Sequence, residues 1–150
     1  MKKGFTLIEL LVVVSLIGVL STLVIANLNS ARERARDTQR KSDLRNIQTA
    51  LRLYYNDSGG YPAGTSVMTA CGSGASPTTC TYGSVWDRSG VTYMNILPKD
   101  PLSPAQDYVY TYTDSDNYAL RACLENKSDD KCVTVLSSVC ASTCKYEVKP

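Results

Sequence analysis

Two sets of residues in this 150-residue sequence have types and spacings that could do chemistry: one isolated glutamate and six cysteines. Glu9 lies inside an otherwise almost wholly apolar run from Phe5 to Leu28. A carboxylate in an apolar medium costs several kcal/mol unless it reaches the interface or finds a cationic partner. We interpret Glu9 either as a charge tolerated near a membrane surface or as the partner of a cation on another chain, such as a free α-amino group.

The six cysteines all follow residue 70, and their spacing suggests pairing between near neighbours in the chain. Six cysteines allow 15 pairings, and the sequence alone does not choose among them. Zinc sites use C-x-x-C-like pairs, and the sequence contains none. An even number of cysteines after an export segment favours disulfides in an oxidising compartment. The pairs that we expect are Cys71–Cys80, Cys123–Cys132 and Cys140–Cys144.

Composition excludes several classes of function. The chain has no histidine, which removes histidine acid–base catalysis, Ser-His and Cys-His nucleophile pairs, and histidine metal sites. Its net charge of +2 comes from 16 basic and 14 acidic side chains, too balanced to predict a nucleic-acid binder. The length is that of one domain. The composition therefore excludes catalysis that depends on histidine.

A cluster of acidic residues near the middle of the second half has the oxygen ligands that Ca²⁺ prefers. Asp114 and Asp116 are its centre, with Asn117 beside them and Asp129 and Asp130 further along. Tight turns rich in aspartate are common without any metal, however. We expect no cofactor, with Ca²⁺ at Asp114 and Asp116 as the alternative.

The apolar run at residues 5–28 is long enough to cross a bilayer as a helix, which takes about 20 residues. A cleaved secretory signal has a shorter apolar region, of about 7–15 residues, followed by a small-residue cleavage site. Here the best small residue, Gly4, lies before the run. The pattern therefore indicates a membrane-spanning helix rather than an ordinary signal peptide.

The helix is predicted to continue through residues 29–56, which contain neither proline nor glycine. Leu44, Ile47, Leu51 and Tyr54 recur at helical spacing and form one apolar face. The charged run at residues 32–45 mixes both signs, which favours a solvated helix face. A DNA- or lipid-binding patch and salt bridges between subunits are the alternatives.

Residues 57–150 are predicted to form a globular head. Residues 63–90 are rich in Gly, Ser and Thr and indicate a loop, and residues 91–97 indicate a short helix or turn. Alternating β-prone residues predict strands near 108–112, 118–125 and 132–137, joined as an antiparallel meander. The fold class is therefore α+β, with one long N-terminal helix packed on a small antiparallel sheet.

The segment Gly4-Phe5-Thr6-Leu7-Ile8-Glu9 resembles the processing motif of type IV pilins and type II secretion pseudopilins. The resemblance implies a leader at residues 1–4, cleavage by a prepilin peptidase between Gly4 and Phe5, and methylation of the new Phe5 amine. It makes Glu9 the assembly carboxylate, paired with the Phe5 amine of the adjacent subunit. It also implies a lollipop-shaped structural subunit, not an enzyme, that polymerises through residues 5–28.

A second resemblance lies in the head, where Leu97-Pro98-Lys99-Asp100-Pro101 is similar to the major pseudopilin. The chain departs from that pattern at Leu102-Ser103, where such heads carry an aromatic–glycine pair. We take a type IV pilus subunit as the main functional hypothesis. The alternatives are a type II secretion major pseudopilin and a membrane-anchored minor pilin or module that binds DNA or a surface.

The expected partners are other copies of the chain, the prepilin peptidase, an inner-membrane assembly platform and the lipid bilayer before assembly. Topology has two conflicting signals. Lys2 and Lys3 argue for an N-terminus in the cytoplasm, whereas the five basic residues between 32 and 41 argue for the opposite orientation. The family resemblance implies the cytoplasmic N-terminus. The subunit would then start in the inner membrane and end in an extracellular filament, or in a periplasmic one for a pseudopilin.

Overall fold

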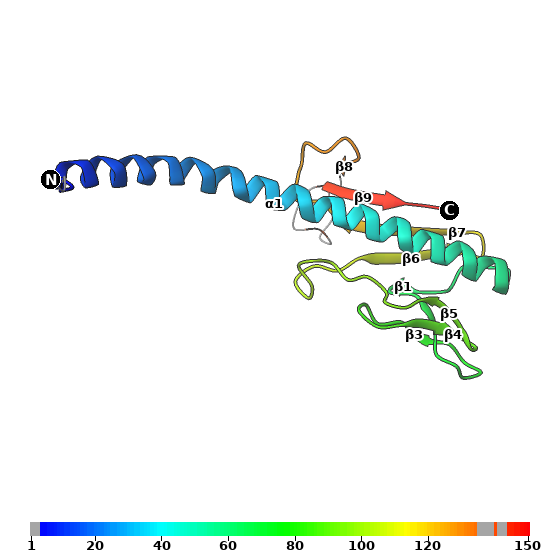
Figure 1. The fold of residues 1–150 in the computed structure, drawn as a ribbon. Coiled ribbons are helices and arrows are strands. Elements are labelled where there is room, and N and C mark those ends of the chain that lie inside the picture. The colour runs from blue at the N-terminus through cyan, green and yellow to red at the C-terminus, as the bar shows by residue number, and fades with distance from the viewer. Residues whose placement is uncertain (1–3, 135–139, 141–143) are drawn as a thin grey trace. The chain divides into compact units, whose positions relative to one another are not determined.

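The computed structural model describes residues 4–134, 140 and 144–150 of the chain. These residues form two compact units, Met1–Ala35 and Arg36–Pro150, and each is described here by itself. The first unit consists of the N-terminal part of a long helix, and the second contains the rest of that helix and the head (Figure 1).

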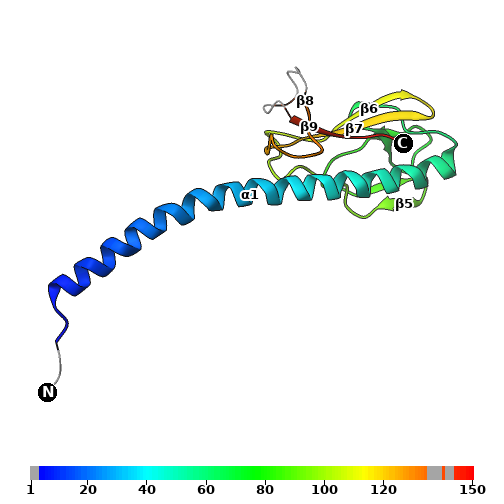
Figure 2. The ribbon, with the colours of Figure 1, turned by 90° about the horizontal axis from the view of Figure 1, so that it is seen from above.

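A single helix, α1, runs from Leu7 to Ser58 over 52 residues. It ends where Gly59 adopts a positive φ of 73° and donates its N–H to the Tyr55 carbonyl oxygen at 2.8 Å. Glycine takes this left-handed conformation without steric cost, and so it closes the last turn of the helix. The helix predicted for residues 5–56 is confirmed, and its later part runs along the strands of the head (Figure 2).

The head contains one larger antiparallel sheet and two small two-stranded ones. The larger sheet has the strand order β1-β6-β7-β9-β8. Its strands are β1 (Thr65–Ser66), β6 (Val109–Asp114), β7 (Asn117–Cys123), β8 (Val133–Thr134) and β9 (Cys144–Val148). The small sheets pair β2 (Thr69–Cys71) with β3 (Thr78–Thr79), and β4 (Trp86–Arg88) with β5 (Val91–Met94).

The predicted meander is wrong in its last step, because β9 lies between β7 and β8. Lys145 of β9 pairs with Cys123 of β7 on one side and with Val133 of β8 on the other. After β7 the chain turns away toward α1, where Asp37 binds two of its backbone N–H groups. This leaves the edge of β7 open to the C-terminal strand. Residues 135–137 of the predicted third strand lie outside the described residues.

Residues 63–97 are more ordered than the predicted loop and short helix or turn. They contribute β1 to β5, and β4 and β5 form a hairpin through Ser89 and Gly90, both at positive φ. The Trp86 indole N–H donates to the Ala70 carbonyl oxygen at 3.1 Å, which joins the two small sheets around a buried ring. Because this order depends on contacts distant in sequence, a composition rich in Gly, Ser and Thr does not reveal it.

The core of the head lies between α1 and the strands. Leu44, Ile47 and Leu51 are completely buried, so the apolar helix face predicted from their spacing is confirmed. They belong to one cluster with Trp86 and Leu120, which are also completely buried. Trp86 is the only tryptophan of the chain, so its fluorescence reports unfolding of the head.

We expect Leu51→Ala to lower the free energy of unfolding of the head by about 2–5 kcal/mol, since it leaves a cavity in the core. Leu53→Ala is the matched control on the same helix, because Leu53 is 54% exposed. Its expected effect is within about 0.5 kcal/mol. Urea unfolding of the purified chain in detergent, followed by Trp86 fluorescence, measures both. Equal effects of the two variants would contradict this description of the core.

Candidate assembly site

The N-terminus of α1 is closed by a reciprocal pair of side chains. The Thr6 backbone N–H donates to Glu9 Oε2 at 2.9 Å, and the Thr6 hydroxyl donates to the same oxygen at 2.6 Å. The Glu9 N–H donates in turn to Thr6 Oγ1 at 3.3 Å. This arrangement is a capping box, in which each residue satisfies a backbone N–H that the helix leaves unpaired. The Thr-x-x-Glu spacing could have predicted it.

All these hydrogen bonds to Glu9 reach one oxygen of its carboxylate. Within the described part of the chain, Oε1 of Glu9 accepts none. The side chain is exposed. Capping its own helix therefore leaves half of the carboxylate open to a second donor.

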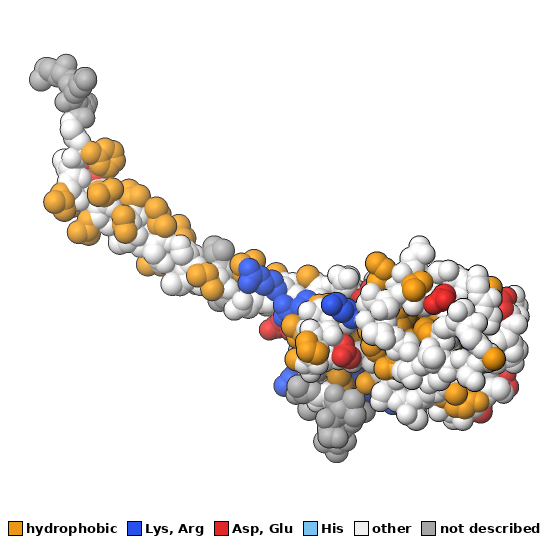
Figure 3. Space-filling view, turned by 90° about the horizontal axis from the view of Figure 1, so that it is seen from below, with side chains coloured by type: hydrophobic (Ala, Val, Ile, Leu, Met, Phe, Trp, Pro, Cys, Tyr) orange, Lys and Arg blue, Asp and Glu red, His pale blue; other side chains and the backbone are white. Residues whose placement is uncertain are grey.

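The apolar surface behind Glu9 is unburied within its own unit. The large apolar side chains described between Phe5 and Leu28 are 44–81% exposed. Figure 3 shows hydrophobic side chains along the surface of this part of the helix. None of the most apolar stretch of the helix is buried within this unit. By length and composition this part of α1 can cross a membrane, and the same surface can pack against copies of itself.

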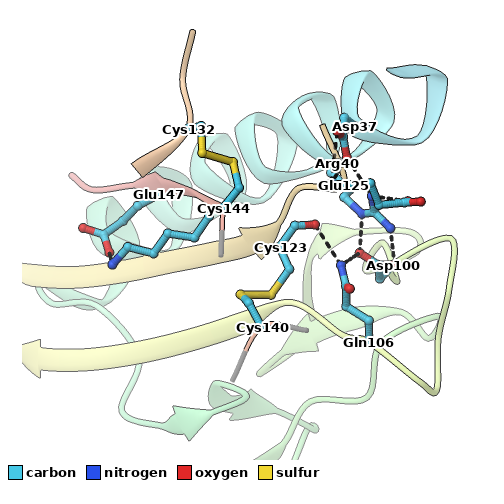
Figure 4. Close-up of a disulfide and its surroundings, with 11 residues drawn as sticks. Asp37, Arg40, Asp100, Gln106, Cys123, Glu125, Cys132, Cys140, Cys144 and Glu147 are labelled. Atoms are coloured by element: carbon cyan, nitrogen blue, oxygen red, sulfur yellow. Dashed lines mark hydrogen bonds and ion pairs between the residues drawn. A yellow bond between two sulfur atoms is a disulfide. The ribbon is translucent and has the colours of Figure 1, made fainter. Parts of the chain in front are cut away.

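The helix segment that enters the head carries a completely buried arginine (Figure 4). Arg40 donates to both oxygens of Asp100, from Nε at 2.7 Å and from Nη2 at 3.1 Å. Its Nη1 donates to Asp37 and to Glu125, each at 2.7 Å. The guanidinium thus joins α1 to two separate loops of the head.

Further bonds extend this ion-pair cluster, which comprises Arg36, Asp37, Arg40, Asp100 and Glu125. Arg36 binds both oxygens of Glu125, at 2.7 and 2.5 Å. The Asp37 carboxylate accepts the backbone N–H groups of Glu125 and Asn126. One turn further along, Lys41 donates to Asp129 at 2.6 Å. Three carboxylates and two guanidiniums are therefore held together by charge-assisted hydrogen bonds.

The favoured prediction of a solvated helix face at residues 32–45 is wrong for this cluster. Asp37 and Arg40 are buried, with exposed fractions of 2% and 0%. They continue the spacing of the apolar stripe toward the N-terminus, because residues 37, 40, 44, 47 and 51 are alternately three and four apart. A count of apolar residues alone ends the stripe at Leu44. It therefore misses Asp37 and Arg40, the two buried charged residues that continue the same spacing.

The charges of the cluster shift its titration. Hydrogen bonds from Arg36 and Arg40 lower the pKa of Glu125 to about 2, although burial acts in the opposite direction. Burial alone would lower the pKa of Arg40, but the hydrogen bonds to its three carboxylates raise it overall. Nearby, burial raises the pKa of Asp43, which accepts the Tyr108 hydroxyl at 2.7 Å. Glu125 and Arg40 are therefore both ionised at neutral pH.

The cysteines form three disulfides, and none is free. The Cys71–Cys80 bond agrees with the expected pair, and its Cα atoms are 5.1 Å apart. The other two expected pairs, Cys123–Cys132 and Cys140–Cys144, are replaced by Cys123–Cys140 and Cys132–Cys144 (Figure 4).

The position of β9 explains the difference in pairing. Cys132 precedes β8, which pairs with the start of β9 at Cys144 rather than with β7. The expected Cys123–Cys132 bond assumed that those two residues face each other across adjacent strands. Cys123 and Cys132 flank residues 124–131, the loop that carries Glu125 and Asp129. The two disulfides therefore hold in place the loop that supplies these acids to the ion pairs with α1.

The calcium candidates lie in the tight turn between β6 and β7. Asp114 accepts the Asp116 N–H at 2.9 Å and the Asn117 side-chain amide at 2.9 Å. The Asn117 and Asp116 hydrogen bonds lower the pKa of Asp114. Asp116 accepts the Tyr55 hydroxyl at 2.6 Å. Among the described residues no three histidine, cysteine or acidic side chains gather as a metal site, and calcium binding stays a prediction.

Comparison with known proteins places the chain in a family. Residues 1–25 match the model of the prokaryotic N-terminal methylation motif, and residues 27–123 match that of type II secretion system protein G. The chain belongs to the type II secretion system protein G family. Members of this family are structural subunits of the pilin and pseudopilin kind and not enzymes. As a member of the protein G family, the chain carries both the processing motif and the head domain.

Individual relatives agree with this assignment. The type II secretion system core protein G of Pseudomonas aeruginosa is 33% identical over 123 residues, covering 81% of this chain and 84% of that protein. The core protein G of Escherichia coli is 33% identical over 108 residues, covering 72% and 70%. The type IV wide pilus major component PilA4 of Thermus thermophilus is 35% identical over 83 residues, covering 55% and 63%. No solved structure matches the chain.

Removing the buried guanidinium of Arg40 should strongly lower the free energy of unfolding of the head. We expect Arg40→Met to cost about 3–5 kcal/mol, because it leaves buried carboxylates without their cation. Arg40→Met combined with Asp100→Asn should recover part of that loss. Arg45→Met, an exposed arginine on the same helix, is the control. Urea unfolding followed by Trp86 fluorescence measures the stability of each variant. Equal stability of the Arg40→Met and Arg45→Met variants would refute a central role for the cluster.

Acid should remove the contribution of Glu125. Its pKa falls from the ordinary 4.5 to about 2 on folding, so its stabilisation is complete above about pH 4.5 and is lost as the pH falls to about 2. Glu125→Gln should therefore be less stable than wild type at pH 7, by roughly 3 kcal/mol, and nearly as stable at pH 2. Glu147 titrates in the same window but is unchanged in both proteins. A stability difference that does not depend on pH would contradict this assignment.

Proposed function

We propose that this chain is the major pseudopilin of a type II secretion system. The match of residues 27–123 to the protein G model carries the proposal, because it extends beyond the N-terminal motif into the head. Several relatives that cover two thirds or more of this chain are named core protein G. The comparisons thus favour the alternative hypothesis from the sequence over the type IV pilus subunit that we had preferred.

Processing is proposed to occur at the junction of Gly4 and Phe5, where a prepilin peptidase removes residues 1–4. Gly4 lies two residues before the capping residue Thr6, outside the helix that begins at Leu7. A non-helical, exposed peptide bond is the form that a protease can bind. Cleavage creates an α-amino group on Phe5, whose methylation keeps it cationic.

The open oxygen of Glu9 gives the Phe5 amine a place to bind. Glu9 Oε2 is engaged by Thr6 of its own chain, and Oε1 accepts no hydrogen bond from the described residues. The amine of an adjacent subunit can therefore donate to Oε1 while the capping box stays intact. Pairing the two charges removes the cost of holding either one alone among apolar helices.

The apolar half of α1 is proposed to serve two environments in turn. In the inner membrane, with the N-terminus in the cytoplasm, lipid covers its exposed side chains. After extraction by the assembly platform, the same side chains pack against other copies in a periplasmic filament. Because both surroundings are apolar, the transfer between them changes little in hydrophobic free energy.

A type IV pilus subunit is the second candidate. The similarity to the wide pilus component of Thermus thermophilus favours it, although that match covers 55% of this chain. A module that binds DNA through residues 32–45 has less support. Three of the five basic side chains between residues 32 and 41 are engaged by acids of the head: Arg36, Arg40 and Lys41.

Deletion of the gene in its parent cell should abolish secretion of type II substrates, and wild-type chain should restore it. Glu9→Gln should reduce assembled filaments by about tenfold or more, the effect of losing about 1.4 kcal/mol per contact. It keeps an oxygen for the capping box but removes the charge. Membrane insertion, measured by carbonate extraction, should not change. Ser21→Ala, a polar residue on the same segment, is the matched control.

Three outcomes contradict the proposal. Secretion that survives the deletion, together with loss of long surface fibres, would assign the chain to a pilus instead. Filaments of Glu9→Gln at wild-type yield would remove the assembly role of the carboxylate. An unprocessed chain starting at Met1 by intact mass would leave the apolar segment as an anchor alone.

A further inference from the structure

The part of α1 inside the head exposes two arginines that lack an ion-pair partner among the described residues. Arg45 and Arg52 are both exposed, and they lie seven residues apart on one side of the helix. Seven residues are about two turns, so their side chains form one stripe with exposed Thr49 between them. We call Arg45 and Arg52 the basic stripe. It differs from Arg36, Arg40 and Lys41, which all bind acids of their own head.

Acidic side chains gather where α1 ends, and we call them the acidic end: Asp57, Asp114 and Asp116. Asp57 lies in the last turn of the helix, which contains no basic residue. The Tyr55 hydroxyl binds Asp116 and so holds the β6–β7 turn against that turn of the helix. Acidic side chains are visible along the right edge of the head in Figure 3. None of the three carboxylates has an ion pair within the described residues.

The acidic end is a place where a cation lowers the energy. The C-terminus of a helix carries a partial negative charge, which the carboxylate of Asp57 increases rather than offsets. A cavity of about 390 Å³ opens beside it, lined by Tyr54, Asp57 and Tyr93 among others. Arg88 also lines this cavity, but its guanidinium donates to the carbonyl oxygens of Gly72 and Gly74. Aromatic faces beside a carboxylate suit a guanidinium of another chain.

The two surfaces are complementary, and no ion pair joins them within the described residues of one subunit. Arg45 precedes Tyr55, the helix residue that binds Asp116, by ten residues, or about 15 Å along the helix, which exceeds the reach of its side chain. Arg52 lies closer, three residues before Tyr55, and is exposed. Two different patches that match each other form a heterologous contact, and repetition of such a contact produces an open helical polymer.

We propose that the basic stripe of one subunit binds the acidic end of a second copy of this chain. This contact rests on the proposed filament function and adds a head-to-head specificity to it. The helix cores supply apolar contact of little directional preference, whereas these charges fix which side of one head faces its neighbour.

Charge reversal with compensation tests the contact in the full-length chain in its own cells. Arg45→Glu with Arg52→Glu should lower the yield of sheared filaments by about tenfold or more. Asp57→Lys with Asp116→Lys should have the same effect, and it keeps Asp114, which accepts the hydrogen bonds within the turn itself. The four substitutions together should restore most of the yield. Lys99→Glu with Lys127→Glu, two exposed lysines of the head, is the matched control and should assemble normally.

A second measurement does not depend on how the variants fold. A photo-crosslinking amino acid at Thr49, with all charges left as they are, should capture the segment around residues 114–116 of a second copy. Capture of a different segment or a different molecule would overturn the contact, as would normal filaments from either reversed pair. Failure of the wild-type chain to polymerise would instead reject the proposed function, and the contact would fall with it.

Discussion

The buried guanidinium of Arg40 is the interaction on which the rest of the head depends. It has no access to water, so each of its donors must find an acceptor inside the protein. Asp37 comes from the same helix, while Asp100 and Glu125 come from two separate loops. Burying a charge in this way contributes little net stability compared with an apolar core, but it permits only one arrangement of helix and loops. The disulfides at Cys123 and Cys132 hold the loop of Glu125 in that arrangement.

The two halves of the helix that carries Arg40 have surfaces that suit different surroundings. Its first half has apolar side chains on all sides, which suits lipid or a bundle of identical helices. Its second half has one apolar stripe, which suits the surface of a head. Charged residues from Arg32 to Lys41 lie at the change between the two patterns. The five basic residues between 32 and 41 argued against an N-terminus in the cytoplasm. Three of them form ion pairs with acidic residues of the same chain in the folded head.

Local rules predicted much of this structure, and contacts distant in sequence account for the rest. Helix length, the stripe at Leu44, Ile47 and Leu51, and the β6–β7 hairpin all follow from spacing and turn residues within one segment. The position of β9 does not, because it depends on where residues 124–131 dock on α1. The disulfide pairs at Cys123 and Cys132 were mistaken for the same reason. The capping box of Thr6 and Glu9 was readable from the sequence, as was the continuation of the stripe to Asp37 and Arg40.

The strand order has a consequence for the order in which the head can fold. Among the described residues, β9 is the last strand along the chain and lies inside the sheet, and β8 pairs only with β9. The sheet therefore cannot close until residues 144–148 are in place. Until then the edge of β7 stays open and β8 has no neighbouring strand. The Cys132–Cys144 disulfide then locks β8 and β9 together, so the pairing that closes the sheet and the bond that holds it closed involve the same end of β9.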